Sequence, residues 1–173
     1  MRTYHQRQFF TLLEVLSVIG IIAIVAGIVL GGMSYAGRRA DQAKTISLMT
    51  QLEMALDAFK QDRGYYPPVA TAAAVEFLTV GSELTIQLGG ATARYAFVHS
   101  STQRPYLEIG TVTATATPYV DAWGNAFQYC CPGTNNTSSY DLWSLGADGA
   151  PGDKKVSGDV PGNGDDICNW KRN

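Results

Sequence analysis

The feature that most constrains this chain is an uncharged, apolar run near its N-terminus. Residues 15–37 carry no charged side chain, and the first part of the run reads VLSVIGIIAIVAGIVLGG. About 20 apolar residues of helix cross the hydrocarbon core of a bilayer, so the run is long enough to span it. A secretory signal peptide has a shorter apolar core, followed by a small-residue cleavage site that is missing here. The run therefore predicts a retained membrane anchor, although basic residues flank both of its ends and leave its orientation undecided.

Composition excludes several classes of function. The formal net charge of -2 argues against a nucleic-acid-binding protein, which usually presents a basic face. The 173 residues allow one small domain beside the anchor, and the part after the anchor is rich in Gly, Thr, Ser and Asn, as in loop-rich extracytoplasmic domains. The chain has no nucleophile-elbow, P-loop or zinc-protease motif, and His99 stands alone in a predicted strand. We therefore expect a protein that is not an enzyme.

A second helical pattern follows the apolar run. Apolar residues recur at spacings of three and four and form one stripe: Ala40, Ala43, Ile46, Met49, Leu52, Leu56 and Phe59. Gly64 and the following Pro67-Pro68 pair predict that the helix ends near Arg63. A helix from Phe10 to that point has about 54 residues and a length of roughly 80 Å. We expect residues 38–63 to pack on the C-terminal domain, and residues 10–37 to face lipid or other copies of the chain.

The periodicity changes after Pro68. Four segments rich in β-branched or aromatic residues alternate with Gly, Pro, Ser and Asn, and they are residues 84–88, 94–99, 105–110 and 126–130. They predict a small antiparallel sheet whose apolar face covers the amphipathic helix, which is an α+β fold. The Thr-rich run 111–117 fits either an edge strand or a surface loop.

Glu14 is the one acidic residue at the start of the apolar run. A carboxylate in hydrocarbon costs about 2–3 kcal/mol unless it finds a partner. Alternatively, Glu14 lies at the headgroup level, where the helix dipole favours an acid near the N-terminus. The residue alone leaves both interpretations open.

The surroundings of Glu14 resemble a known signal. Residues 10–30, FTLLEVLSVIGIIAIVAGIVL, resemble the class III signal of type IV pilins and type II secretion pseudopilins. This resemblance implies that residues 1–9 are a leader, and that a prepilin peptidase cuts between Phe9 and Phe10 and methylates the new amine. Glu14 would then neutralise the amine of an adjacent subunit during assembly. Phe9 stands where the family normally has Gly.

Four further motifs narrow the resemblance. They are DAFKQDRGYYP at 57–67, DAWGNAFQY at 121–129, YDLWSLGADG at 140–149 and DDICNW at 165–170. In order and rough position they are similar to those of the major pseudopilin, the general secretion pathway protein G family. The similarity covers the helix and both ends of the domain but fails between about 69 and 118. It implies a pilin-like fold with a β-rich periplasmic domain over residues 64–173.

The C-terminal loop concentrates carboxylates among Gly and Pro, namely Asp148, Asp153, Asp159, Asp165 and Asp166. By themselves they fit either a calcium site or a solvated acidic loop. The resemblance implies one bound Ca²⁺, held by side-chain oxygens of Asp148, Asp165 and Asp166 and by backbone carbonyls of Leu145 and Ala150. Asp153 and Asp159 are candidates for a further ligand in the longer connection 151–164.

Three cysteines lie near this loop, and none forms a C-x-x-C pair, which argues against zinc. A disulfide from Cys131 or Cys130 to Cys168 is one interpretation, with Cys131–Cys168 as the favoured pair; three buried free thiols are the other. Trp170 is expected to pin the C-terminal segment, whereas Trp123 and Trp143 fit the core.

Three functions follow from these features. The first is a structural subunit of a type II secretion pseudopilus, at the inner membrane with its domain in the periplasm. Its implied partners are further copies of itself, minor pseudopilins, the prepilin peptidase, the inner-membrane assembly platform, and membrane lipid before assembly. The second is a surface type IV pilus subunit for adhesion or motility. The third is a tethered calcium- or carbohydrate-binding module that never polymerises, which Phe9 favours because an uncut leader leaves Glu14 without its amine.

Overall fold

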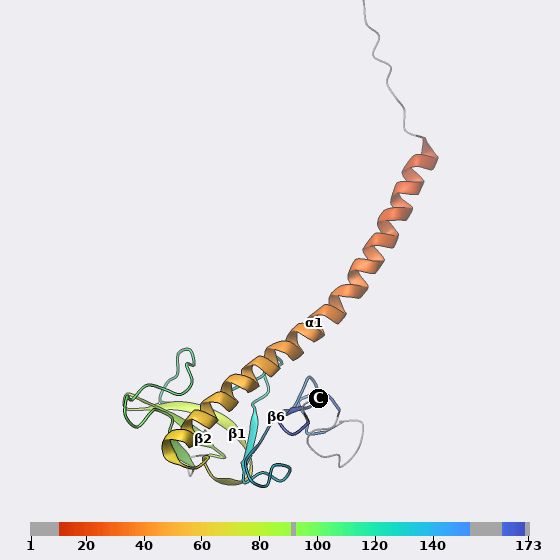
Figure 1. The fold of residues 1–173 in the computed structure, drawn as a ribbon. Coiled ribbons are helices and arrows are strands. Elements are labelled where there is room, and N and C mark those ends of the chain that lie inside the picture. The colour runs from red at the N-terminus through yellow and green to blue at the C-terminus, as the bar shows by residue number, and fades with distance from the viewer. Residues whose placement is uncertain (1–10, 91–92, 153–163, 172–173) are drawn as a thin grey trace, which may run out of the picture. The chain divides into compact units, whose positions relative to one another are not determined.

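The computed structural model describes residues 11–90, 93–152 and 164–171, with the side chains of residues 29–34 left out. The chain divides into two compact units, Met1–Ala40 and Asp41–Asn173. Helix α1 (Leu12–Arg63) contributes to both units (Figure 1).

The first unit consists, in its described part, of the N-terminal half of α1. Thr11 caps the helix, because its Oγ1 accepts a hydrogen bond from the backbone N–H of Glu14 at 3.2 Å. Every side chain from 11 to 28 is exposed, including Leu12 at 91% and Ile28 at 71% of their accessible surface. Among the described residues, no helical segment combines the length and the apolar character that crossing a membrane requires.

In the second unit, α1 buries one face. Met49, Leu52, Leu56 and Phe59 are each at most 2% exposed, as the stripe predicted. The first turns of that stripe were wrong: Ala40, Ala43 and Ile46 are exposed, and Thr45 is buried in their place. Thr45 tolerates burial because its Oγ1 accepts a hydrogen bond from the backbone N–H of Ala122 at 3.1 Å.

The helix ends at Arg63, as predicted. Gly64 adopts a left-handed φ of 85°, and its N–H donates to the carbonyl of Lys60 at 2.7 Å. Asp62 lies in the last turn of the helix. Its carboxylate accepts hydrogen bonds from the Ser100 backbone N–H at 2.7 Å, from the Ser100 hydroxyl at 2.6 Å, and from the Tyr106 hydroxyl. The C-terminus of α1 is thereby tied to the segment 98–106.

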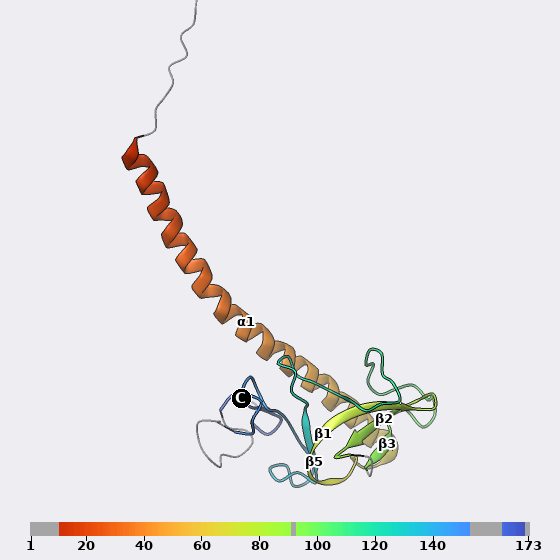
Figure 2. The same ribbon diagram turned by 180° about the vertical axis from the view of Figure 1, so that it is seen from behind.

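The strands form an antiparallel sheet in the order β3-β2-β1-β5-β6-β7, with β4 paired to β1 (Figure 2). Their bounds are β1 Val69–Val80, β2 Glu83–Leu88, β3 Arg94–Ala96, β4 Thr117–Pro118, β5 Gln128–Cys131, β6 Asp141–Ser144 and β7 Ile167–Cys168. The long strand β1 joins the two halves of the sheet. Its second part pairs with β2, and its first part pairs with β5.

The predicted strands at 84–88 and 126–130 are confirmed within two residues, and 94–99 is confirmed in its first half. The strand at 105–110 was wrong. Pro105 has no N–H for a ladder and forms only an isolated bridge with Val98, after which Tyr106 turns its hydroxyl to Asp62. The Thr-rich run is mostly loop, with only Thr117 in a strand.

The core lies between the buried face of α1 and the inner face of the sheet. Phe59 is its centre, with ring centroids 5.8 Å from Phe97 and 5.7 Å from Tyr106. Phe77, Phe127 and Tyr129 are further core aromatic residues, at 0–1% exposure. Aromatic pairs at these distances add about 0.5–1.5 kcal/mol each beyond their buried area.

We predict an acid-sensitive contact at Asp62. The Ser100 and Tyr106 hydrogen bonds hold the pKa of this carboxyl well below its usual range. Because the pKa is depressed in the folded chain, the stabilisation is present above about pH 4, the ordinary carboxyl pKa, and is lost as pH falls through the folded pKa. Asp62→Asn should therefore lower the melting temperature at pH 7 and flatten its decline below pH 4, compared with wild type. Equal acid profiles for wild type and Asp62→Asn, with the exposed Glu83→Gln as control, would contradict this account.

Candidate functional site

The predicted assembly residues lie at the start of α1. Phe9 and Phe10 fall outside the described residues, whereas Glu14 occupies the first turn of the helix and is exposed. Val15, Val18 and Ile19 adjoin it and are exposed to 47%, 49% and 58%. A single carboxylate thus stands at the end of an uncovered apolar helix.

The predicted calcium ligands gather where β6 and β7 leave the sheet. The two strands pair Trp143 with Cys168 and Ser144 with Ile167. Continuing this register places the turn after β6, residues 145–152, beside Asp165 and Asp166. All five predicted ligand residues therefore belong to one small region of the domain: Leu145, Asp148, Ala150, Asp165 and Asp166.

Each carboxylate in this region contacts the backbone of the turn. Asp165 Oδ2 accepts hydrogen bonds from the backbone N–H groups of Ala147 at 2.6 Å and Asp148 at 3.0 Å. Asp166 Oδ2 accepts one from Gly152 at 2.8 Å, and Asp148 Oδ1 accepts one from Ala150 at 2.9 Å. The side chains of Asp165 and Asp166 thereby fold the turn 145–152 back onto the start of β7.

Gly146 allows Asp165 to approach this closely. Its φ is +64°, and a Cβ at this position would come within 2.6 Å of the Asp165 carboxyl carbon. Both the backbone conformation and the missing side chain are therefore required. The turn is built around the carboxylate of Asp165.

The donor set suits a hard cation. Three carboxylates and several backbone carbonyls provide only oxygen, which Ca²⁺ prefers, and calcium also accepts waters and irregular loops. In the described ranges, no three Asp, Glu, His or Cys side chains come close enough together to hold a metal ion by themselves. Asp153 and Asp159, the candidates for a further ligand, lie outside the described residues. Calcium here would thus depend on the carbonyls of Leu145 and Ala150 as well as on the carboxylates.

A hydrogen-bond network supports the turn from behind. Asp121, which is 4% exposed, accepts bonds at Oδ1 from the backbone N–H groups of Trp123 and Asn125, both at 2.9 Å. Its Oδ2 accepts the Ser144 hydroxyl at 2.6 Å, and Ser144 Oγ in turn accepts the N–H of Gly146 at 3.1 Å. The Asn125 amide donates to the Gly146 carbonyl at 2.7 Å.

Sequence reasoning did not assign a role to Asp121, Asn125 or Ser144. The available signal was the spacing D-x-x-G-N at 121–125, in which an Asp side chain caps a tight turn completed by Gly124 at φ +92°. That signal predicts a turn. It does not say which neighbouring segment the turn supports.

The cysteines are all free. The expected Cys131–Cys168 disulfide is not formed, because neighbouring residues of a strand point to opposite faces: Cys131 packs on the main core, and Cys130 faces a separate cluster with Trp143 and Cys168. Cys130 and Cys168 belong to this cluster from strands β5 and β7, which β6 separates, and both are free thiols. Burial raises the pKa of all three thiols.

Trp170 packs against this same cluster. Its ring meets that of Trp143 edge to face at 5.8 Å, so the expected pinning of the C-terminal segment is confirmed. Trp143 is 6% exposed and belongs to this core, and Trp123 is half-buried.

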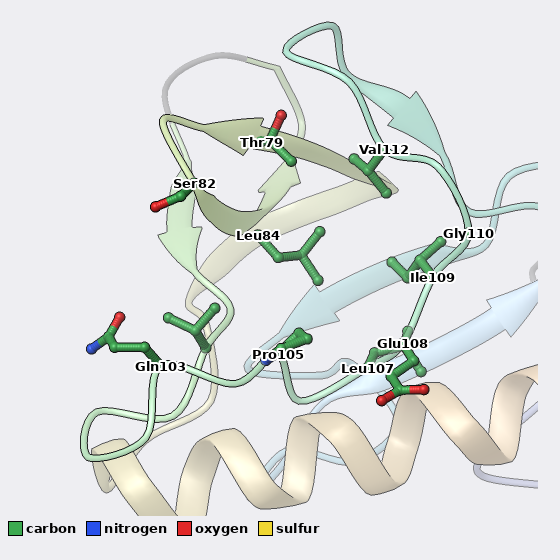
Figure 3. A pocket seen from close by; sticks show the side chains of 11 residues that line it. Thr79, Ser82, Leu84, Gln103, Pro105, Leu107, Glu108, Ile109, Gly110 and Val112 are labelled. Carbon is green, nitrogen blue, oxygen red and sulfur yellow. The ribbon is translucent and has the colours of Figure 1, made fainter.

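The domain also contains a hollow away from the turn 145–152. It has a volume of about 380 Å³ and lies between the β1–β2 hairpin and the segment 103–112 (Figure 3). Its lining mixes aliphatic side chains such as Leu84, Leu107 and Ile109 with polar ones, among which Glu108 is the one titratable residue. A lone carboxylate has no second group for acid–base catalysis.

Comparison with known proteins identifies the family. Residues 96–169 match the family model for type II secretion system (T2SS), protein G. The type II secretion system core protein G of Vibrio cholerae is 32% identical over 170 residues, covering 98% of this chain and 96% of the relative. That of Aeromonas hydrophila is 32% identical over 161 residues, covering 93% and 90%.

A solved structure also matches. The major pseudopilin from the type 2 secretion system of enterohaemorrhagic Escherichia coli is 25% identical, covers 82% of this chain and 92% of its own, and superposes with a TM-score of 0.43. The assignment rests on the near full-length relatives, which select the first of the three functions considered from the sequence. The chain belongs to the type II secretion system protein G family and is a structural pseudopilin subunit of a periplasmic pseudopilus, not an enzyme.

Proposed function

We propose that this subunit polymerises through the N-terminal half of α1 after cleavage between Phe9 and Phe10. The observation that carries the proposal is the uniform exposure of residues 11–28, a stretch dominated by Leu, Ile and Val. A continuous apolar surface of this kind is unfavourable in water and marks a lipid or protein contact. Lipid covers it before assembly, and neighbouring copies cover it in the filament.

Before assembly the subunit has a fixed orientation in the membrane and a set of protein partners. Residues 10–37 form a single-pass anchor in the inner membrane, and the domain 64–173 lies in the periplasm. The prepilin peptidase removes residues 1–9 and methylates Phe10. The inner-membrane assembly platform and minor pseudopilins then act on a subunit whose domain is already folded, because the second unit contains its own core.

Glu14 gives this assembly its register. A carboxylate buried among apolar helices is costly unless a cation lies next to it. The free amine of Phe10 on an incoming subunit supplies that charge, so only one axial placement of the new helix leaves Glu14 compensated.

We predict that Glu14→Ala abolishes filament formation while the domain stays folded. Shearing cells and measuring the chain in the fibre fraction gives assembly, and protease resistance of the membrane fraction reports the fold. Glu83→Ala, an exposed glutamate at the β1–β2 turn, is the matched control and should assemble as wild type does. If Glu14→Ala formed fibres in wild-type amounts, the role proposed for Glu14 in assembly would be wrong.

We further propose that the turn 145–152 and Asp165–Asp166 bind one Ca²⁺. Asp148, Asp165 and Asp166 supply side-chain oxygens, and the carbonyls of Leu145 and Ala150 supply two more. The support is their shared position at the β6–β7 exit and the hard, all-oxygen donor set. When bound, the ion offsets the mutual repulsion of the three carboxylates and ties the C-terminal segment to the sheet.

Calcium should stabilise residues 38–173 against heat. At a free concentration one hundred times Kd, binding to the native state alone contributes about 2.7 kcal/mol. For a domain of this size that corresponds to a rise in melting temperature of about 5–10 °C over EDTA. Asp165→Ala should remove most of the rise, and magnesium should give little of it. Identical melting in millimolar Ca²⁺ and in EDTA would refute the calcium site.

A further inference from the structure

The turn that carries the predicted calcium ligands is connected to helix α1 by a continuous hydrogen-bonded path. The path begins at Thr45 Oγ1, which is fully buried and accepts the N–H of Ala122. Asp121 directly precedes Ala122 in the chain, and its carboxylate holds the turn 121–125 together and accepts a hydrogen bond from the Ser144 hydroxyl.

From Ser144 the path enters the calcium turn itself. Both backbone groups of Gly146 are held: its N–H by Ser144 Oγ at 3.1 Å and its carbonyl by the Asn125 amide at 2.7 Å. A Cβ on Gly149 would lie 3.0 Å from Asn125 Oδ1, so the Asn125 side chain also packs against the turn at Gly149. One asparagine therefore contacts the turn on both sides of Asp148.

We propose that Asp121 and Asn125 are the positioning residues of the calcium turn, and that through Thr45 they couple its occupancy to helix α1; this rests on the calcium binding proposed above. None of these three side chains is a predicted ligand. They fix the backbone of residues 144–149, and hence the direction of its carbonyls, before the ion arrives. Side chains that hold ligands in this way usually change metal affinity by 10–100-fold when removed.

The coupling to α1 follows by reciprocity. If ion binding tightens the turn 121–125, it also favours the docked state of Thr45, and loosening Thr45 must weaken calcium binding by the same factor. The energetic link runs through hydrogen bonds between α1, the 121–125 turn and β6, all inside the second unit.

The test is a calcium titration of the full chain in detergent, by competition with a chelator dye. Asn125→Ala should raise Kd about 10–100-fold, and Thr45→Val, on another element, about threefold to tenfold. Two matched controls should keep the wild-type Kd. Thr50→Val removes a hydroxyl that bonds only its own helix at Ile46, and Asn136→Ala disrupts the separate loop at Tyr140 and Asn169.

A second readout separates positioning from general destabilisation. In EDTA, Asn125→Ala should speed hydrogen exchange at the amides of Ala147 and Asp148, whereas Asn136→Ala should not. A wild-type Kd for Asn125→Ala, or an equal rise for Asn136→Ala, would overturn the positioning role, and a wild-type Kd for Thr45→Val would overturn the coupling to α1; the calcium site itself would stand in either case. A wild-type chain that bound no calcium would overturn the calcium site and the coupling together.

Discussion

The structure of the second unit depends on one interaction, the burial of a single face of α1 against the sheet. Met49, Leu52, Leu56 and Phe59 each lose nearly all of their accessible surface there. Truncating a residue of this kind to Ala usually costs about 2–5 kcal/mol, which is a large part of the stability of a small domain. The same helix carries an uncovered apolar surface in its N-terminal half. The two halves of α1 therefore differ: one packs on the chain's own sheet, and the other is the half that we propose is covered by lipid or by other copies of the chain.

The sequence correctly predicted those parts of the fold that depend on residues close together in the chain, such as the end of the helix and its buried face. Gly64 ended the helix where a left-handed residue was expected, and spacing predicted the buried stripe from Met49 to Phe59. The stripe failed in its first turns, where Ile46 is exposed and Thr45 is buried instead. Hydrophobicity alone does not predict a buried hydroxyl that has a backbone hydrogen-bond partner on another segment. The strand predicted at 105–110 failed because Pro105 has no N–H to donate to a ladder and the Tyr106 hydroxyl turns to Asp62. The long strand β1 was missed because its first half is mostly Ala and Thr.

In the candidate site, too, some residues could be identified from the sequence and others could not. Motifs grouped Asp148 with Asp165 and Asp166 as calcium ligands, and the β6–β7 pairing brings the two ends of that loop together. The supporting residues Asp121, Asn125 and Ser144 were not assigned, because their roles exist only through contacts between segments about 20 residues apart. The disulfide failed on a simple geometric ground. Adjacent strand residues face opposite sides, so proximity in the sequence did not place Cys131 beside Cys168.

We propose that a processed N-terminus on an exposed apolar helix drives assembly, and the intact mass of the chain in sheared fibres is the measurement to make first. The account predicts a species that begins at Phe10 and carries one added methyl group. That mass would show that the peptidase accepts Phe9 before the cut, and that an amine is present at Phe10 with which Glu14 can pair. Fibres made of chains that begin at Met1 would contradict the account, because Glu14 would then be buried in the filament without a compensating charge.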